Sequence, residues 1–302
     1  YQRYLERQGI YASMSYPQIG VLSHDRGNFL YTLLMRYRRF SLDLAEEFWP
    51  QPESALLSGI LLGVETSIPD KVYEAFQNTG TSHIIAISGF NITLIAGLFA
   101  SLSGRLFNPK RAFWISIIGI TIYTLLVGAD AAVVRAAFMG GLALFGRQIG
   151  RKGSGVNTLA FTAAVMAAFE PHILWDIGFQ LSFAATLGLV LYAEPLTQWF
   201  INLANRWTTE ERAETLAGPV GEYLLFTLAA NITTIPLIIL YSGGISLLSP
   251  LVNLLILPVQ PAIMILGGLA IISGSLFFTI GNLLAYLAWP FAYYTIRIVE
   301  WM

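Results

Sequence analysis

Several polar side chains lie in a segment that otherwise has the pattern of a membrane-spanning helix. The stretch TGTSHIIAISGFNITLIAGL, residues 79–98, carries His83, Ser88 and Asn91 where lipid favours leucine. Polar groups at membrane depth are costly and usually face a bundle interior or a water-filled cavity. These three residues therefore either hold helices together or belong to a polar path. The neighbouring series Gly89, Thr93 and Gly97 predicts close approach of another helix.

Ser88 and His83 do not form a convincing nucleophile and base. The intramembrane serine proteases of the rhomboid type carry GxSG, whereas this chain reads AISG. His83 lies five residues before Ser88, which places the two side chains on nearly opposite sides of a helix. We expect no catalytic residue here.

Asp130 and Arg135 form a second polar pair, near the entrance of the apolar segment 132–147. Arg135 lies at least one turn inside that segment. Its guanidinium either pairs with Asp130 as a structural clamp or offers a fixed fork to a phosphate. Both interpretations stay open at this point.

The remaining candidates lie at helix starts and beside prolines. Asp176 is placed to cap a helix, because a carboxylate is favoured by the free N–H groups of a first turn. Gln180, one turn deeper, is not explained as a cap. Asn231 and Asn253 precede Pro236 and Pro258, and amides near a proline can satisfy the backbone groups that it frees.

The composition places these residues in a polytopic membrane protein. Of 302 residues, 55% are hydrophobic and 12% are charged, whereas about 25% are charged in soluble domains. Mean hydropathy is +0.63. We expect an all-α helical membrane bundle of about eight spans, at residues 83–104, 112–128, 132–147, 156–170, 176–194, 219–241, 247–273 and 276–299.

Three segments depart from simple spans. Residues 247–273 contain Pro250, Pro258 and Pro261, so we expect a broken or re-entrant helix there. Residues 29–49 have one apolar and one charged face, which predicts an amphipathic helix at the membrane interface or capping the bundle. Residues 53–64 are apolar but too short to span, which favours a buried or partly inserted helix.

The basic residues predict the orientation. Loops with Lys and Arg stay in the cytoplasm, and the first connection holds Arg105, Lys110 and Arg111, while the third holds Arg147, Arg151 and Lys152. Odd-numbered connections are therefore cytoplasmic, and eight spans leave both ends of the chain outside. The start at Tyr1 and the end directly after an apolar run lead us to expect part of a longer protein.

Several function classes are disfavoured. The chain has no cysteine and three histidines that lie far apart, which argues against thiol chemistry and metal sites. We expect no metal and no cofactor. GxxxxGK[ST] is missing, so an energy source would have to be a separate motor.

Four blocks resemble, in order, the signature blocks of the ComEC family of bacterial competence proteins. They are TGTSHIIAISGFNITLIAGL, VVRAAFMGGLALFGRQIGRK, EPHILWDIGFQLSFAATLGL and TLAANITTIPLIILYSGGISLLSPLVNLLILP. RYLERQGIYAS resembles the end of the family's amino-terminal soluble region, which is OB-like. The resemblance thus implies a tail and linker at 1–28 and a competence membrane domain at 29–302. Asn91 departs from the family, where many members have histidine, so proton transfer is not available there.

The resemblance implies a multi-pass channel in the bacterial inner membrane that conducts single-stranded DNA into the cytoplasm during natural transformation. Its implied partners are the strand, membrane lipid, an outer DNA receptor and a cytoplasmic helicase-like motor ATPase; the oligomeric state stays open. Full-length members commonly add a metallo-β-lactamase-like domain, but HxHxDH is absent here, so we expect no enzyme activity. The candidates for pore-lining or DNA contact are His83, Ser88, Asn91, Asp130, Arg135, Asp176, Gln180, Asn231 and Asn253.

A secondary transporter of a small anionic metabolite is the alternative. Asp130, Arg135 and Asp176 would then form a substrate or proton site, and a broken seventh segment fits a transporter half-helix. The lack of a visible inverted repeat counts against it. A conducted strand needs a longer polar path than a pocket at mid-membrane.

Overall fold

A computed structural model describes residues 12, 28–150, 154–207, 221–242, 246 and 248–302. These residues form a bundle of helices without a strand, which confirms the all-α prediction. The predicted tail and linker at 1–28, as well as Arg151 and Lys152, lie almost wholly outside the described part. The α-helices are α2 (Phe29–Phe48), α3 (Glu53–Leu62), α4 (Asp70–Asn78), α5 (Gly89–Leu106), α6 (Pro109–Val127), α7 (Ala131–Gln148), α8 (Gly155–Phe169), α9 (Ile177–Ala204), α11 (Phe226–Ser242), α12 (Ser249–Ile256), α13 (Gln260–Gly274) and α14 (Phe278–Trp301).

The described helices account for each predicted span, although not all are equally suited to cross a membrane. Among the described residues, five helical stretches are long and apolar enough to do so: Ser82–Leu106, Pro109–Val127, Ile177–Ala204, Tyr223–Tyr241 and Ser249–Gly274. Gly155–Phe169 is apolar but shorter. The polytopic bundle is thus confirmed, and the count of eight is approximate.

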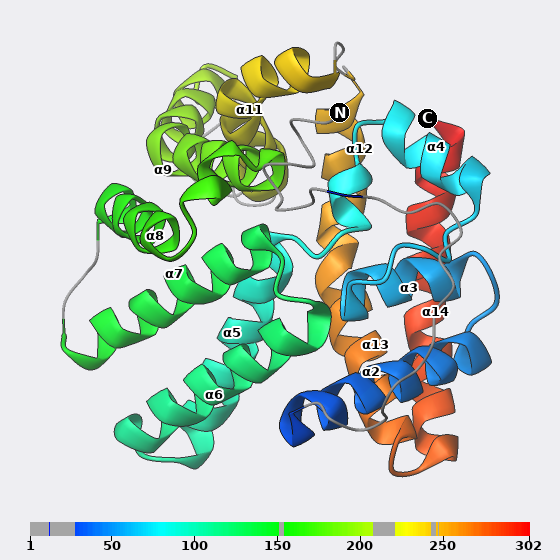
Figure 1. Ribbon diagram of the computed structural model, residues 1–302. Helices are drawn as coiled ribbons and strands as arrows, with labels where there is room; N and C mark the ends of the chain where they lie inside the picture. Colours follow the sequence, from blue (N-terminus) through cyan, green and yellow to red (C-terminus); the bar gives the residue numbers. More distant parts are fainter. Residues whose placement is uncertain (1–11, 13–27, 151–153, 208–220, 243–245, 247) are drawn as a thin grey trace.

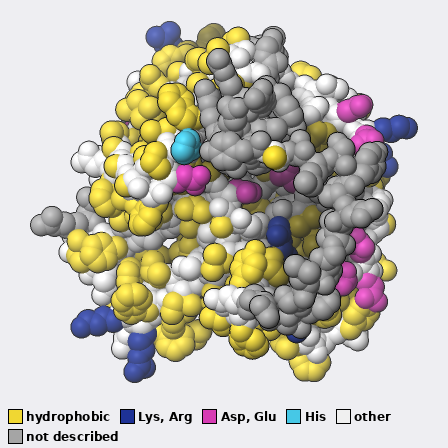
Figure 2. All heavy atoms as spheres, in the orientation of Figure 1, with side chains coloured by type: hydrophobic (Ala, Val, Ile, Leu, Met, Phe, Trp, Pro, Cys, Tyr) yellow, Lys and Arg dark blue, Asp and Glu magenta, His cyan; other side chains and the backbone are white. Residues whose placement is uncertain are grey.

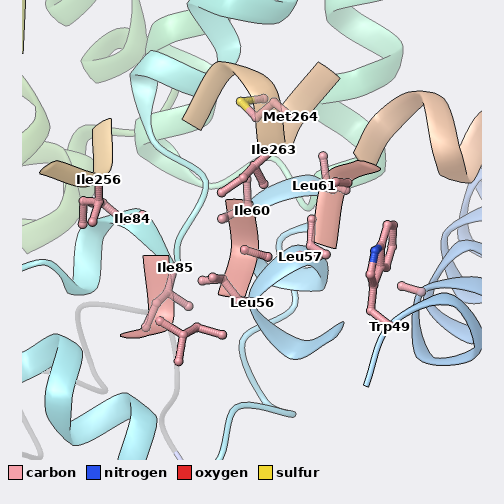
Figure 3. Packing of buried hydrophobic residues seen from close by; sticks show 14 of the residues in the cluster. Trp49, Leu56, Leu57, Ile60, Leu61, Ile84, Ile85, Ile256, Ile263 and Met264 are labelled. Carbon is pink, nitrogen blue, oxygen red and sulfur yellow. The ribbon is translucent and has the colours of Figure 1, made fainter. Parts of the chain in front are cut away.

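The short helix α3 forms the centre of the core. All ten of its residues are buried, as expected for a segment that is apolar on every side and too short to span. Figure 3 shows Ile60 of α3 between Ile85 and the α13 residue Ile263, with Leu57 beside it. In Figure 1, α2, α13 and α14 surround α3 on one side, and α5, α6 and α7 extend away from it on the other.

Side chains from three other helices satisfy the end of α3. The last carbonyls of a helix lack intrahelical partners. Arg38 of α2 donates from Nε and Nη2 to the Leu62 carbonyl, at 3.0 and 2.8 Å. Tyr123 Oη donates to the Leu61 carbonyl at 3.2 Å, and Asn91 Nδ2 donates to the Ile60 carbonyl at 3.4 Å.

Arg38 joins two helix ends. Its Nη2 also lies 3.0 Å from the Gly63 carbonyl and 3.3 Å from the Val127 carbonyl, at the ends of α3 and α6. A cation is favoured at helix C-termini, where the carbonyl dipoles add. Gly63 ends α3 with a φ of +68°, in the left-handed region that favours glycine.

The predicted amphipathic helix is α2, and the structure shows it as a cap on the bundle. It buries Ser41, Leu44 and Ala45 and contacts α3, α6, α13 and α14. Its first turns are apolar yet outward-facing, with Phe29 78% and Leu30 67% exposed. A place at the membrane interface stays a prediction for these turns.

The proline-rich seventh segment is interrupted but does not turn back. A 3-10 turn at Leu257–Val259 separates α12 from α13. The backbone stays right-handed helical at Leu257 and at Gln260, so α12 and α13 stand end to end as one column in Figure 1. The re-entrant alternative is therefore wrong, because prolines at the first positions of a helical turn remove N–H groups without reversing the chain.

Small residues bring two helix pairs into close contact. On α9, a Cβ at Gly188 would collide with the Ala229 carbonyl and Thr233 Oγ1 of α11. Thr233 Oγ1 donates to the Ala184 carbonyl at 2.6 Å. At the turn between α13 and α14, a Cβ at Gly281 would collide with Gly274. Such close backbone approach is typical of helix contacts in membranes.

Two predictions around the opening segment are only partly confirmed. The apolar stretch Ser82–Leu106 agrees with the predicted span at 83–104, but its α-helix, α5, begins at Gly89; a 3-10 turn at Ser82–Ile84 precedes it, because Ile84 and Ile85 enter the core beside α3. In the glycine series, α7 approaches Gly89, where a Cβ would stand 2.9 Å from Arg135 Nη2 and 3.7 Å from Ala136 Cβ. No such approach occurs at Gly97, where a Cβ would meet no atom within 4 Å. The helix α4 was not predicted.

Candidate functional site

Arg135 is a buried cation without a carboxylate partner among the described residues. It lies in the second turn of α7 and is 5% exposed. Its Nη1 donates to Thr186 Oγ1 on α9 and lies 3.7 Å from Met139 Sδ. Its Nε is buried and has no hydrogen-bond partner. A buried charge in this state is costly unless something compensates it.

The start of α5 lies directly against this guanidinium. A Cβ built at Gly89 would stand 2.9 Å from Arg135 Nη2. Ser88, at the N-cap position, makes no side-chain capping bond; its Oγ donates to Asn91 Oδ1 at 3.2 Å instead. The structure thus brings together Ser88, Asn91 and Arg135, three of the predicted site residues.

Asn91 also has a structural role. It is 3% exposed, and its amide links the first turn of α5 to the end of α3 through the Ile60 carbonyl. His83 lies in the 3-10 turn before α5, with an exposed side chain. The Ser88 hydroxyl donates to Asn91 and not to His83, so no nucleophile–base pair is formed here.

The expected alternative of an Asp130–Arg135 clamp is not what the structure shows. Asp130 precedes α7 with an exposed side chain and makes no side-chain capping bond. Its charge acts on Glu65 instead. Partial burial first, and the negative charge of Asp130 second, raise the pKa of Glu65 above its usual range.

Asp176 and Gln180 tie helix ends together at the start of α9. Asp176 caps α9 as predicted, and its Oδ1 accepts from the Phe179 N–H at 2.7 Å. Gln180 donates to the Leu174 carbonyl at 2.8 Å and accepts from Tyr241 Oη at 2.5 Å. Gln180 therefore connects the start of α9 to the end of α11.

The amides beside the prolines have few partners. Asn253 is 3% exposed, and its Oδ1 is buried without a hydrogen bond. Gln260, seven residues on and hence on the same helical face, is 2% exposed with both amide atoms unpartnered. Asn231 on α11 is half-buried.

Sequence reasoning missed the contacts of Arg38, Tyr123, Thr186 and Gln260. A signal existed for Arg38, because it lies three and seven residues before Ser41 and Ala45 on the buried face of α2. For Thr186, only the tertiary contact with α7 shows the role. No three His, Asp or Glu side chains in the described part of the chain come together to hold a metal ion.

The surface agrees with a protein that has few charges. Figure 2 shows a face covered mainly by hydrophobic side chains, with acidic groups and a histidine near its middle and basic groups mostly at its edges. Exposed aromatic residues are frequent, including Phe90 at 42% on the first turn of α5 and Trp114 at 62% on α6.

Comparisons with known proteins agree with the resemblance seen in the sequence. The family model of the competence proteins matches residues 60–302. The chain is 26% identical over 271 residues to ComE operon protein 3 of Bacillus subtilis (strain 168), covering 89% of this chain and 32% of that protein. It is 29% identical over 260 residues to the uncharacterized protein YcaI of Escherichia coli (strain K12), covering 80% of this chain and 33% of that protein.

A third relative is the competence protein ComA of Neisseria gonorrhoeae, 26% identical over 212 residues that cover 67% of this chain and 28% of that protein. The chain therefore spans about a third of the length of these curated relatives. No solved structure matches it. The family match covers most of the chain, including α5, Arg135 and every later helix, and the chain belongs to the competence protein family.

Proposed function

We propose that this chain is the membrane part of a channel that moves single-stranded DNA across the bacterial inner membrane during natural transformation. Membership of the competence protein family carries the proposal. Two relatives are named for competence, ComE operon protein 3 and ComA. We therefore assign to this chain, as the membrane part, a share in the competence role for which these longer relatives are named.

Arg135 supports the proposal at the level of chemistry. A strand that crosses the membrane carries one phosphate charge per nucleotide, and an unpaired cation inside the bundle attracts that charge. Few such cations are consistent with conduction, because a channel must bind the strand weakly enough to release it again. An outer receptor would deliver the strand and a cytoplasmic ATPase would drive it.

The transporter alternative gains less support. It relied on a substrate or proton site formed by Asp130, Arg135 and Asp176 and on a half-helix in the seventh segment. Asp130 makes no ion pair with Arg135 in the described residues, and α12 continues into α13 as one column.

The test is DNA uptake by an Arg135→Gln variant in a transformable host whose own relative has been deleted. The wild-type protein should restore entry of labelled DNA into the cytoplasm. Loss of a contact to a charged group, about 1.5–3 kcal/mol, should lower uptake by about tenfold or more. The matched control is Arg297→Gln, since Arg297 is an exposed arginine whose partner is Glu300.

Membrane levels of both variants should be equal by immunoblot. If the Arg135→Gln variant is present at a normal level and takes up DNA as well as the wild type, Arg135 does not contact the strand. Failure of the wild-type chain to restore uptake, although it is present in the membrane, would contradict the channel proposal.

A further inference from the structure

The first turn of α5 is an open helix N-terminus. The first N–H groups of a helix have no intrahelical acceptor, and those of Asn91 and Ile92 turn back to the Ser88 carbonyl at 3.1 and 3.4 Å. Ser88 is the natural cap, but its hydroxyl donates to Asn91 and caps nothing. The donors of Gly89 and Phe90 therefore stay available, with the positive end of the helix dipole behind them.

A second positive group is directed at the same place. Arg135 is nine-tenths buried or more, and its Nη2 lies against Gly89. Only Nη1 of this guanidinium makes hydrogen bonds with described residues, and Nε is buried without one. The N-terminal end of α5 and the guanidinium are both positive, so they repel each other. A negative group bound between them would offset this repulsion and accept hydrogen bonds from both.

We propose that the first turn of α5 and Arg135 form a binding site for one phosphate group, here called the α5 phosphate site. Helix N-termini bind phosphates through their free N–H groups and dipole. The guanidinium adds a planar fork that matches two phosphate oxygens. Thr186 holds Nη1, which leaves Nη2 and the buried, unpartnered Nε as the remaining donors of the fork.

Gly89 is the residue that permits this approach. With a side chain at this position, a Cβ would stand 2.9 Å from Nη2 and force the guanidinium away. Asn91 holds the first turn of α5 in place, because its amide Nδ2 donates to the Ile60 carbonyl at the end of α3. Ser88, Gly89 and Thr186 around the site are half-buried, and Phe90 is exposed.

The assignment of the phosphate to a DNA strand rests on the proposed function. Phe90, 42% exposed and on the same first turn, offers an aromatic surface for a base. A phosphodiester would therefore gain a contact that inorganic phosphate lacks. A lipid headgroup supplies the same phosphate chemistry, and the experiment separates these sources.

The experiment uses the purified chain in nanodiscs of phosphatidylcholine, with binding measured by calorimetry and by thermal shift. The probes are inorganic phosphate and a twelve-nucleotide oligothymidylate. We expect saturable binding of both, with the oligonucleotide tighter. Arg135→Gln should weaken binding of both by about tenfold or more. Gly89→Ala should weaken it too while α5 stays intact, because alanine favours helix. Arg297→Gln is the control and should bind like wild type.

Each outcome decides something different. No binding of inorganic phosphate, or equal binding by wild type and Arg135→Gln, would overturn the α5 phosphate site. Phosphate binding without oligonucleotide binding would keep the site and contradict the DNA channel. Loss of phosphate binding in nanodiscs rich in phosphatidic acid would assign the site to a lipid headgroup and overturn its assignment to a strand. Should Arg135→Gln unfold, Gly89→Ala carries the test.

Discussion

Arg135, Asn91 and Gln260 are polar residues with the same degree of burial but with different surroundings. Their exposed fractions are 5, 3 and 2%. Asn91 bonds to Ser88 and to the end of α3, Arg135 is only partly bonded, and both amide atoms of Gln260 lack partners among the described residues. A buried polar group costs free energy when unpaired and little when paired. The hydrogen-bond partners of a buried polar residue, and not its type, therefore distinguish a structural amide from a candidate binding residue.

Replacing Gln260 with methionine should raise the stability of the protein. Methionine has a similar shape and needs no hydrogen bond, so the penalty of an unpaired buried amide, about 1–3 kcal/mol, is removed. Thermal unfolding in detergent should show a higher Tm for Gln260→Met. The control is Gln180→Met, which should lower Tm because Gln180 uses both amide atoms. An equal fall in both variants would show that Gln260 has a bonded partner, such as ordered water.

At the scale of elements, glycines decide which helices come close. Gly188 on α9 lies against Ala229 and Thr233 of α11, whereas Gly97 on α5 has open space beside it. Both glycines occur in runs of small residues on predicted spans. Sequence reasoning assigned close approach to the series Gly89, Thr93 and Gly97, whereas the structure shows it at Gly89 and at Gly188 but not at Gly97. Local pattern alone did not distinguish the two, because the approach depends on where the neighbouring helix runs.

The pair Gly188→Ala and Gly97→Ala tests this difference. A methyl group at residue 188 should separate α9 from α11 and cost about 1–3 kcal/mol, as overpacking does in cores. The same change at residue 97 meets no atom within 4 Å and should leave the unfolding midpoint unchanged. Protease resistance of α9 and α11 in detergent gives a second readout. Equal destabilisation by both changes would contradict the packing described here.

For the whole molecule, four basic residues lie at one end of α5, α6 and α7. Arg105 ends α5, Lys110 and Arg111 begin α6, and Arg147 ends α7. The rings of Phe113 and Phe145 lie 6.4 Å apart, which brings the α6 start beside the α7 end. Trp114, 62% exposed in the same region, is a residue typical of membrane interfaces. This end is therefore predicted to face the cytoplasm.

The absence of cysteine allows a direct test of that orientation. Lys110→Cys places one thiol at the basic end, and Glu170→Cys places one at the connection between α8 and α9. A membrane-impermeant maleimide added to intact cells should label residue 170 and spare residue 110. Permeabilised cells, in which both sites react, serve as the control. Labelling of residue 110 from outside would reverse the predicted topology.

The amino-acid sequence by itself determined the helical membrane bundle, the buried short helix at 53–62, the Asp176 cap and the family. These follow from composition, from apolar runs and from short-range patterns, which act through neighbours along the chain. Only the tertiary structure decided that α5 begins at Gly89, that α12 and α13 form one column, and that Arg135 meets Thr186 and the start of α5 instead of Asp130. Each of these depends on contacts between residues far apart in the chain. No local pattern encodes such contacts, because they arise when separate helices compete to bury the same apolar surface.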